Sequence, residues 1–199
     1  MKLALKEWNT TIEALGQGLI TAVWRKGGIE DTPSVWEKNT TFEVPDKKFI
    51  LLPTFTHQNL DKIKKDFWPL FNQNHKLNKD GQVLIKYWAG LEKEIEIETL
   101  DELLNISSQL INSNEHLIKT WETSPLHKGK ILILKIFELA NPVLITNSFE
   151  NGGCKSWAQI KVEIPEAKSK RVLRLSELNK KVRFIQALLK QKEQIMVRL

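Results

Sequence analysis

The sequence predicts an α+β fold in which helices flank a mixed β-sheet. Patterns typical of helices and of strands follow one another without strict alternation, which argues against a doubly wound α/β sheet. The most hydrophobic run, from Ile131 to Phe137, is typical of a central strand. The sequence contains no internal repeat or heptad array, so solenoid and coiled-coil architectures are excluded.

In the first half of the chain, the spacing of apolar residues predicts two helices and four strands. Four of them recur at helical spacing before the glycines at 16 and 18: Leu5, Trp8, Ile12 and Leu15. We expect Pro69 to end the second helix, because proline interrupts a helix interior. The expected helices span 4–15 and about 60–67, and the expected strands span 19–24, 49–52, 82–88 and 94–98.

In the second half, capping residues mark two helix starts. Thr99 and Glu102 form a capping-box pattern that opens a helix through about residue 111, and Ser113 caps another through Trp121. A last helix begins near Ser176, and its apolar stripe consists of Leu178, Val182, Ile185 and Leu189. The expected strands of this half span 131–137, 142–145 and 156–164.

The net charge of +6 is distributed unevenly along the 199 residues. Residues 165–199 contain ten Lys and Arg against three Asp and Glu, a balance of +7, whereas residues 1–164 have a balance of −1. We therefore predict one α+β domain over 1–165, followed by a basic extension over 166–199 that carries an amphipathic helix. We expect the domain to fold when the extension is removed. The asymmetry indicates either an acidic partner, RNA or DNA above all, or a solvated helix that aids solubility.

Cysteine content and hydropathy indicate a cytoplasmic protein. A single cysteine excludes an intramolecular disulfide framework and fits a reducing compartment. Lys6 and Glu7 interrupt the apolar start, and no run approaches the ~20 apolar residues of a membrane span, so we expect no signal peptide and no membrane partner. The four histidines are scattered, and we expect neither a metal nor a cofactor.

Two glycine pairs lie next to cations at strand edges. Arg25 and Lys26 precede Gly27 and Gly28, where flexible N–H donors and two cations can hold a phosphate, or where the pair is only a turn. The second string runs through Gly152, Gly153, Cys154, Lys155, Ser156 and Trp157. In it, Lys155 would favour the Cys154 thiolate, and the competing interpretation is a small buried cysteine at a turn.

His57 and Gln58 follow a short apolar strand. We expect Thr54 or Thr56 to cap a helix that begins here, which places both residues at its N-terminus. The partial positive charge of a helix N-terminus lowers a histidine pKa and suits a general base. A surface histidine in a first turn is the alternative.

Four strings of the chain resemble a bacterial family that is common in cyanobacteria and catalogued as a domain of unknown function. The strings are Ala4-Leu5-Lys6-Glu7-Trp8, Arg25-Lys26-Gly27-Gly28-Ile29-Glu30, Phe49-x-Leu51-x-Pro53-Thr54-x-x-His57-Gln58 and Gly152-Gly153-Cys154-Lys155-Ser156-Trp157. The resemblance covers about residues 4 to 164. It implies a cyanobacterial-type cytoplasmic protein and no particular reaction.

A second similarity is to PUA-like domains of the ASCH and EVE kind. It rests on the segment from Ile12 to Arg25, and on Lys128-Gly129-Lys130 before the run from Ile131 to Phe137. The similarity implies a small, partly open β-barrel, so we expect the mixed sheet to be strongly curved. Such domains often bind RNA or modified bases, and function must still be argued from the site.

The leading hypothesis is a non-catalytic module that binds nucleic acid or a nucleotide. Arg25, Lys26 and Lys155 would contact phosphate, and Trp157 or Trp24 would stack on a base. The complete set of candidate contacts is Arg25, Lys26, Gly27, Gly28, Gln58, Gly152, Gly153, Lys155, Ser156 and Trp157.

Two other hypotheses come from different classes. In the first, the protein is a hydrolase or transferase that acts on a phosphorylated or nucleotide-like substrate, with Cys154 as nucleophile and His57 as general base. In the second, it is an interaction or regulatory subunit, or a homodimer, that docks through the C-terminal helix. The docking hypothesis requires the apolar stripe of that helix to be exposed.

Overall fold

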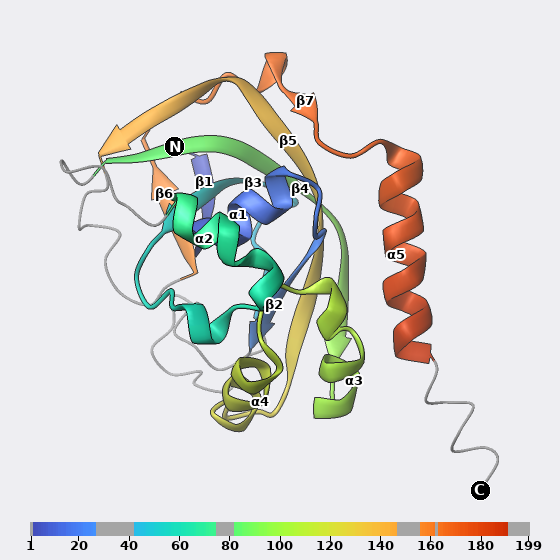
Figure 1. Ribbon diagram of the computed structural model, residues 1–199. Coiled ribbons are helices and arrows are strands. Elements are labelled where there is room, and N and C mark those ends of the chain that lie inside the picture. The colour runs from blue at the N-terminus through green and yellow to red at the C-terminus, as the bar shows by residue number, and fades with distance from the viewer. Residues whose placement is uncertain (1, 27–41, 75–81, 147–155, 162, 191–199) are drawn as a thin grey trace, which may run out of the picture.

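The computed structural model describes residues 2–26, 42–74, 82–146, 156–161 and 163–190. It confirms an α+β fold built on a strongly curved mixed sheet (Figure 1). The strand order is β2-β5-β4-β3-β1-β6, and β7 pairs with β5. The strands are β1 (Lys2–Trp8), β2 (Ala22–Lys26), β3 (Lys48–Thr54), β4 (Gln82–Ile97), β5 (Gly129–Thr146), β6 (Trp157–Ile160) and β7 (Lys170–Arg171).

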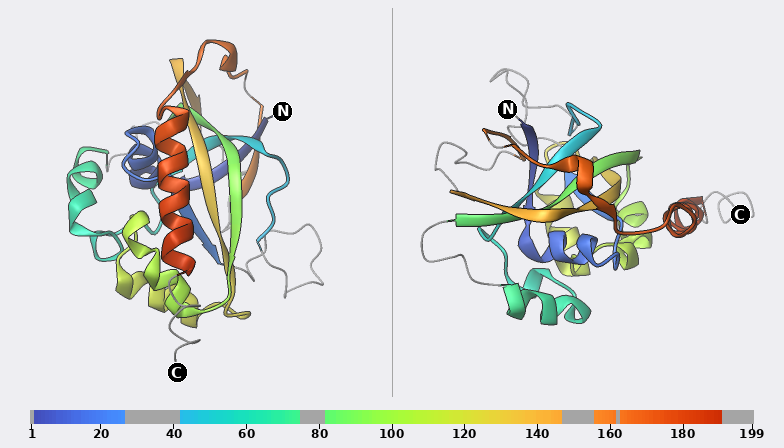
Figure 2. Two further views of the ribbon diagram at one scale, coloured as in Figure 1. Left: turned by 90° about the vertical axis from the view of Figure 1, so that its right-hand side faces the viewer. Right: turned by 90° about the horizontal axis from the view of Figure 1, so that it is seen from above.

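Helices cover both faces of the sheet. Two of them, α1 and α2, lie inside its curve, and α5 stands against the other face beside β5 (Figures 1 and 2). The α-helices are α1 (Asn9–Gly16), α2 (Trp68–Asn74), α3 (Leu100–Asn105), α4 (Asn114–Glu122) and α5 (Leu175–Lys190). Short 3₁₀ turns add η1 (Leu60–Lys62), η2 (Lys65–Phe67), η3 (Ser107–Gln109) and η5 (Glu166–Lys168).

The long central strand β5 supplies core residues to both faces, because successive side chains of a strand point in opposite directions. Leu132 and Leu134 pack in the cluster that contains α1 and α2. Ile131 and Ile133 pack in a second cluster with α3, α4 and α5. This arrangement explains why the run from 131 to 137 is almost continuously apolar.

The apolar stripe of α5 faces its own domain. Leu178 and Ile185 are 2 % and 0 % exposed and belong to the second cluster, and Val182 and Leu189 pack against it. The stripe is therefore not exposed, and the docking hypothesis loses the observation it requires. The boundary near residue 165 stays a prediction, although this cluster includes residues on both sides of it.

The predicted helix over 4–15 is wrong in its first half. Residues 2–8 form β1, which lies between β3 and β6, and the helix α1 begins only at Asn9. Ala4 and Leu5 are both 0 % exposed, because an interior strand with two covered faces buries successive residues. Tertiary pairing thus overrides a spacing that is also compatible with a helix.

Two pairs of predicted strands are each one strand. The runs at 82–88 and 94–98 both belong to β4, whose register shifts between Ile85 and Tyr87 and between Leu91 and Lys93. Bulges of this kind bend a long strand without ending it. The run at 142–145 likewise continues β5, whereas the strand expected over 156–164 covers only 157–160.

The helix predicted over 60–67 is also wrong. This segment forms the turns η1 and η2, and α2 then begins at Trp68. Pro69 lies in the first turn of α2 instead of ending a helix, which proline tolerates because the first N–H groups of a helix have no intrahelical acceptor. The capping box of Thr99 and Glu102 and the cap at Ser113 are confirmed.

Candidate functional site

Described residues from each of the four strings that carry the family resemblance lie around β1. Leu5 pairs with Trp157 across the β1–β6 ladder, and Trp8 pairs with Thr54 across the parallel β1–β3 ladder. The Arg25 guanidinium reaches Glu7 from β2. Residues far apart in the sequence are therefore neighbours at the end of β1, where α1 begins.

Arg25 is held in a nearly buried ion pair. Its Nη2 lies 2.6 Å from Glu7 Oε2 and also donates to the Lys6 carbonyl oxygen at 3.0 Å. The Arg25 and Glu7 side chains are only 16 % and 10 % exposed. The other carboxylate oxygen, Glu7 Oε1, accepts from the Trp8 backbone N–H at 2.8 Å. The arginine is thus fixed in position, and Glu7 neutralises its charge.

Gln58 acts as a cap for α1 from a distant part of the chain. Trp8 precedes the helix without a side-chain cap, and Gln58 Oε1 accepts from the Thr10 backbone N–H at 3.0 Å. A helix N-terminus leaves its first N–H groups without intrahelical partners, so this contact satisfies one of them. Because Oε1 is the acceptor here, the Gln58 side chain is fixed with Nε2 as a free donor.

The helix expected after Thr54 or Thr56 is absent, so His57 does not lie at a helix N-terminus. Residues 55–59 form a loop, and the next element is η1. His57 is exposed with a positive φ of 60°, and its carbonyl oxygen accepts from Lys62 Nζ at 2.8 Å. The left-handed backbone of His57 turns the chain so that the next side chain, Gln58, points inward toward α1.

We call Glu7, Thr10, Arg25 and Gln58 the β1–α1 corner. Three buried atoms of this corner have no hydrogen-bond partner: Thr10 Oγ1, Arg25 Nε and Gln58 Nε2. Buried polar groups are nearly always hydrogen-bonded, so an unpartnered donor needs an explanation. Here three such atoms come from α1, β2 and the loop after β3.

Trp8, which follows Glu7 of the corner, contacts His116 and Lys62. The Trp8 and His116 rings lie 5.4 Å apart between centroids, and Lys62 Nζ lies 6.0 Å from the Trp8 ring. Burial lowers the pKa of His116 to about 4, and the positive charges of Lys62, Lys119 and Lys26 act in the same direction against Asp61. His116 is therefore neutral near pH 7, and the local positive charge comes from the lysines.

The two tryptophans expected to stack on a base already contact other aromatic rings. Trp24 stacks on Trp121 at 6.1 Å. Trp157 stacks on Phe42 at 5.8 Å, and its Nε1 donates to the Glu43 carbonyl oxygen at 3.0 Å. Both rings therefore belong to the packing of the domain.

Half of the predicted site residues lie outside the described residues: Gly27, Gly28, Gly152, Gly153, Cys154 and Lys155. Of the others, Lys26 Nζ donates to Thr123 Oγ1 at 3.4 Å, and the Ser156 carbonyl oxygen accepts from the Lys6 N–H at 2.7 Å. The roles of Cys154 and His57 in an enzyme stay predictions.

A second candidate surface lies on the C-terminal part of the chain. We call it the basic face, and its exposed cations are Lys168, Lys170, Arg171, Arg174, Lys180, Arg183 and Lys190. None of the Lys and Arg side chains described between 168 and 190 forms an ion pair, whereas the described ion pairs all use cations no later than Lys135. The ring of Phe184 is 51 % exposed among these cations.

The basic face is joined to the sheet through a row of stacked rings. Trp88 and Phe137 stack at 3.9 Å between centroids with an interplanar angle of 3°. Lys48 Nζ lies 4.5 Å from the Trp88 ring, and the Arg171 guanidinium lies 5.4 Å from the Phe137 ring. Arg171 is also the partner of Phe137 across the β5–β7 ladder, so the cation–π contact adds to the strand pairing that holds β7 beside β5.

One known family model matches most of this chain. The model of the domain of unknown function DUF1802 matches residues 4–183. The chain belongs to this family. A search of curated proteins and a search of solved structures gave no significant match. The family match includes the first half of α5, in agreement with the packing of this helix on the core.

None of the described helices of the DUF1802 domain is long and apolar enough to cross a bilayer.

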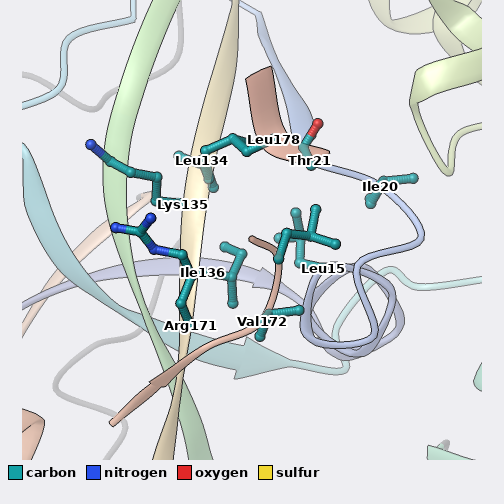
Figure 3. Close-up of a pocket in the computed structure, with 10 residues that line it drawn as sticks. Leu15, Ile20, Thr21, Leu134, Lys135, Ile136, Arg171, Val172 and Leu178 are labelled. Atoms are coloured by element: carbon teal, nitrogen blue, oxygen red, sulfur yellow. The ribbon is translucent and has the colours of Figure 1, made fainter. Parts of the chain in front are cut away.

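The DUF1802 domain has a small apolar hollow between α1, β5 and the segment that follows β7 (Figure 3). Its lining includes Leu15, Ile136 and Val172, and the charged ends of Lys135 and Arg171 point away from it (Figure 3). The hollow has room for about one water molecule, so we do not assign a ligand to it.

Three residues of the two surfaces were not found from the sequence. Glu7 and Thr10 belong to a segment that the sequence predicts as one amphipathic helix, which hides their place at a strand–helix junction. Phe184 lies off the apolar stripe of α5, next to Arg183. Its position on the polar side of the helix is a signal that the sequence does contain.

Proposed function

We propose that this DUF1802 domain is a non-catalytic nucleic-acid-binding module and that its binding surface is the basic face. The observation that carries the proposal is the row of exposed cations from Lys168 to Lys190 without a carboxylate partner. Uncompensated positive charge on one surface attracts the phosphate backbone of DNA or RNA. Elsewhere in the described residues, many cations are neutralised by ion pairs.

The exposed ring of Phe184 favours a single-stranded partner. A phenylalanine ring at 51 % exposure leaves much of its apolar surface in contact with water. Single-stranded nucleic acids offer unpaired bases that stack on such rings, beside cations that contact the backbone. The similarity to PUA-like domains, which often bind RNA, agrees with this proposal by analogy. From the family resemblance we further infer a cyanobacterial-type protein of the cytoplasm.

Removing two cations of α5 is expected to weaken binding and to flatten its salt dependence. In the Lys180→Gln, Arg183→Gln double variant, the slope of log K against log salt for a labelled single-stranded RNA should become shallower by about 1.4, which corresponds to two lost phosphate contacts. Fluorescence anisotropy over a salt series measures this slope. The matched control is Lys65→Gln with Lys119→Gln, which removes the same charge from η2 and α4. Equal slopes in both double variants, or no binding of RNA or DNA at low salt, would contradict the proposal.

Removing the ring of Phe184 is expected to lower affinity without changing the salt slope. Phe184→Ala should cost about 1–3 kcal/mol of binding free energy, the usual contribution of one stacked base. The control is Leu175→Ala, because Leu175 is also 51 % exposed on α5 and has no ring to stack. Titration of the same RNA at one salt concentration distinguishes the variants. Similar affinities for both would mean that no base stacks on Phe184.

A further inference from the structure

We infer that a single-stranded nucleic acid binds the basic face lengthwise along α5, from Arg174 just before the helix to Lys190 at its end. This inference rests on the proposed function and deepens it, because it names the path and the length of the nucleic acid that the domain takes. The placement of the cations on α5 and the carboxylates beside the other cations of the basic face support it.

The outward side of α5 belongs to a helix that is fixed to the core. Leu178 and Ile185 are buried in the second cluster, and Lys181 Nζ donates to the Leu19 carbonyl oxygen at 3.1 Å. Seen from above, α5 stands at the edge of the described fold, beside the sheet (Figure 2). Cations on its outward side therefore keep a fixed spacing and are accessible to a large ligand.

Three cations follow one line along this outward side. At about 100° per residue, Lys180, Arg183 and Lys190 lie within roughly 80° of one another around the helix axis, opposite the apolar stripe. All three are exposed, and so is Arg174, the residue before the helix. Ala187 is exposed on the same side between Arg183 and Lys190, and its small side chain leaves the line open. We call Arg174, Lys180, Arg183 and Lys190 the α5 cations.

Little negative charge opposes the α5 cations from their own segment. Between residues 167 and 190 the only acidic residue is Glu177, and its Oε2 accepts from the Arg174 backbone N–H at 2.9 Å. Phe184 lies one turn after Lys180, and residues four apart are neighbours on a helix surface. A base can therefore stack on the exposed Phe184 ring while the phosphates next to it contact the α5 cations.

Two cations that precede α5 lie closer to carboxylates. Lys170 is directly opposite Glu138 across the β5–β7 ladder, where opposite charges attract each other. Lys168 belongs to the turn η5, which also contains Glu166. Neither lysine forms an ion pair, yet each has a carboxylate nearby that repels phosphate. The path of the nucleic acid therefore follows the helix and not the segment from 168 to 170.

The length of α5 sets the length of nucleic acid that it can contact. Its 16 residues span about 24 Å at about 1.5 Å per residue. Nucleotides of one stacked strand are about 3.4 Å apart, so about seven of them cover the helix, and fewer do so in an extended strand. Four phosphate contacts at about −0.7 each give an expected slope of log K against log salt of about −2.8.

A length series of oligouridine tests this footprint. Labelled probes of four, seven, ten and thirteen nucleotides are titrated with the full chain at several salt concentrations, and fluorescence anisotropy reports binding. We expect the salt slope to steepen from four to seven nucleotides, as the RNA reaches both ends of α5, and to stay constant from seven to thirteen. Thirteen nucleotides are too few for two domains side by side. A slope that keeps steepening up to thirteen would mean that the RNA extends beyond α5, and the inference would be wrong.

Two double variants test the path. Arg174→Gln with Lys190→Gln removes the cations at the two ends of the line and should make the slope for the longest probe shallower by about 1.4, which is two contacts at about 0.7 each. Lys168→Gln with Lys170→Gln is the matched control, because it removes the same charge from the same basic face. The control should leave the slope nearly unchanged. All four side chains are exposed, so both variants should keep the urea midpoint of the natural sequence.

The outcomes distinguish the path from the proposed function. Equal slopes in the two double variants would mean that the nucleic acid binds the basic face without following α5. The same holds if Arg174→Gln with Lys190→Gln changes nothing while Lys180→Gln with Arg183→Gln flattens the slope. In either case the path is overturned and the proposed function stands. If the natural sequence binds neither RNA nor DNA at low salt, both are overturned.

Discussion

Ending the chain after Arg174 is expected to lower the free energy of unfolding by roughly 5 kcal/mol, a large part of the total stability of a typical domain. The truncation removes α5, whose Leu178 and Ile185 are fully buried in the second core cluster. Each such side chain contributes about 1.5–3 kcal/mol, and Val182, Leu188 and Leu189 add partly buried area. Urea unfolding followed by tryptophan fluorescence measures the loss.

Two neighbouring substitutions in α5 separate packing from helix loss. Ile185→Ala is expected to cost about 2–5 kcal/mol, the usual effect of emptying a buried aliphatic site, because Ile185 is 0 % exposed. Phe184→Ala is the control, since it removes a larger side chain that is 51 % exposed and should change the stability by less than about 0.5 kcal/mol. A truncated chain with unchanged urea midpoint would show that the core is complete without α5.

The sequence alone predicts the opposite for this truncation. The strings of the family resemblance all end before residue 164, and the net charge changes from −1 over 1–164 to +7 over 165–199. These two observations predict that the last segment lies outside the folded domain. An apolar stripe that packs on its own domain and one that packs on a partner have the same periodicity. Only the burial of Leu178 and Ile185 decides between them.

The fold class could be predicted because short sequence patterns indicate the individual helices and strands. Ile131 to Phe137, the capping box at Thr99 and the stripe of α5 are properties of short segments, and each lies in the element that it predicts. The errors come from long-range pairing. Residues 4–8 are a strand because β3 and β6 pair with them, and the helical spacing of Leu5 and Trp8 contains no information about those partners.

The sequence indicated some residues of the candidate site but not which of them contact one another. Arg25 and Gln58 could be chosen from the sequence as polar residues at element ends. Two contacts follow from the sheet order and not from the sequence pattern. Arg25 is paired with Glu7, and Gln58 caps a helix that begins before it in the chain. The basic face was visible in the charge count, whereas its lack of carboxylate partners required the structure.

Arg25→Ala is expected to lower the free energy of unfolding by about 3 kcal/mol, the low end of the range for breaking a buried ion pair by removing one partner. The Glu7 carboxylate would keep only the Trp8 N–H, and the Lys6 carbonyl oxygen would lose the bond from Arg25. A charge left unpaired at 10 % exposure is poorly solvated, and this desolvation is the source of the effect.

The matched control is Lys128→Ala, which breaks an ion pair of similar chemistry at the surface. Lys128 Nζ lies 3.1 Å from Glu98 Oε1, with side chains 51 % and 61 % exposed. Water solvates both groups after the substitution, so the cost should stay below about 1 kcal/mol. Urea unfolding of the two variants compares these costs directly. If Arg25→Ala lost no more stability than Lys128→Ala, the Arg25–Glu7 pair would contribute no more than a surface pair, and the expected cost of leaving Glu7 unpaired would be wrong.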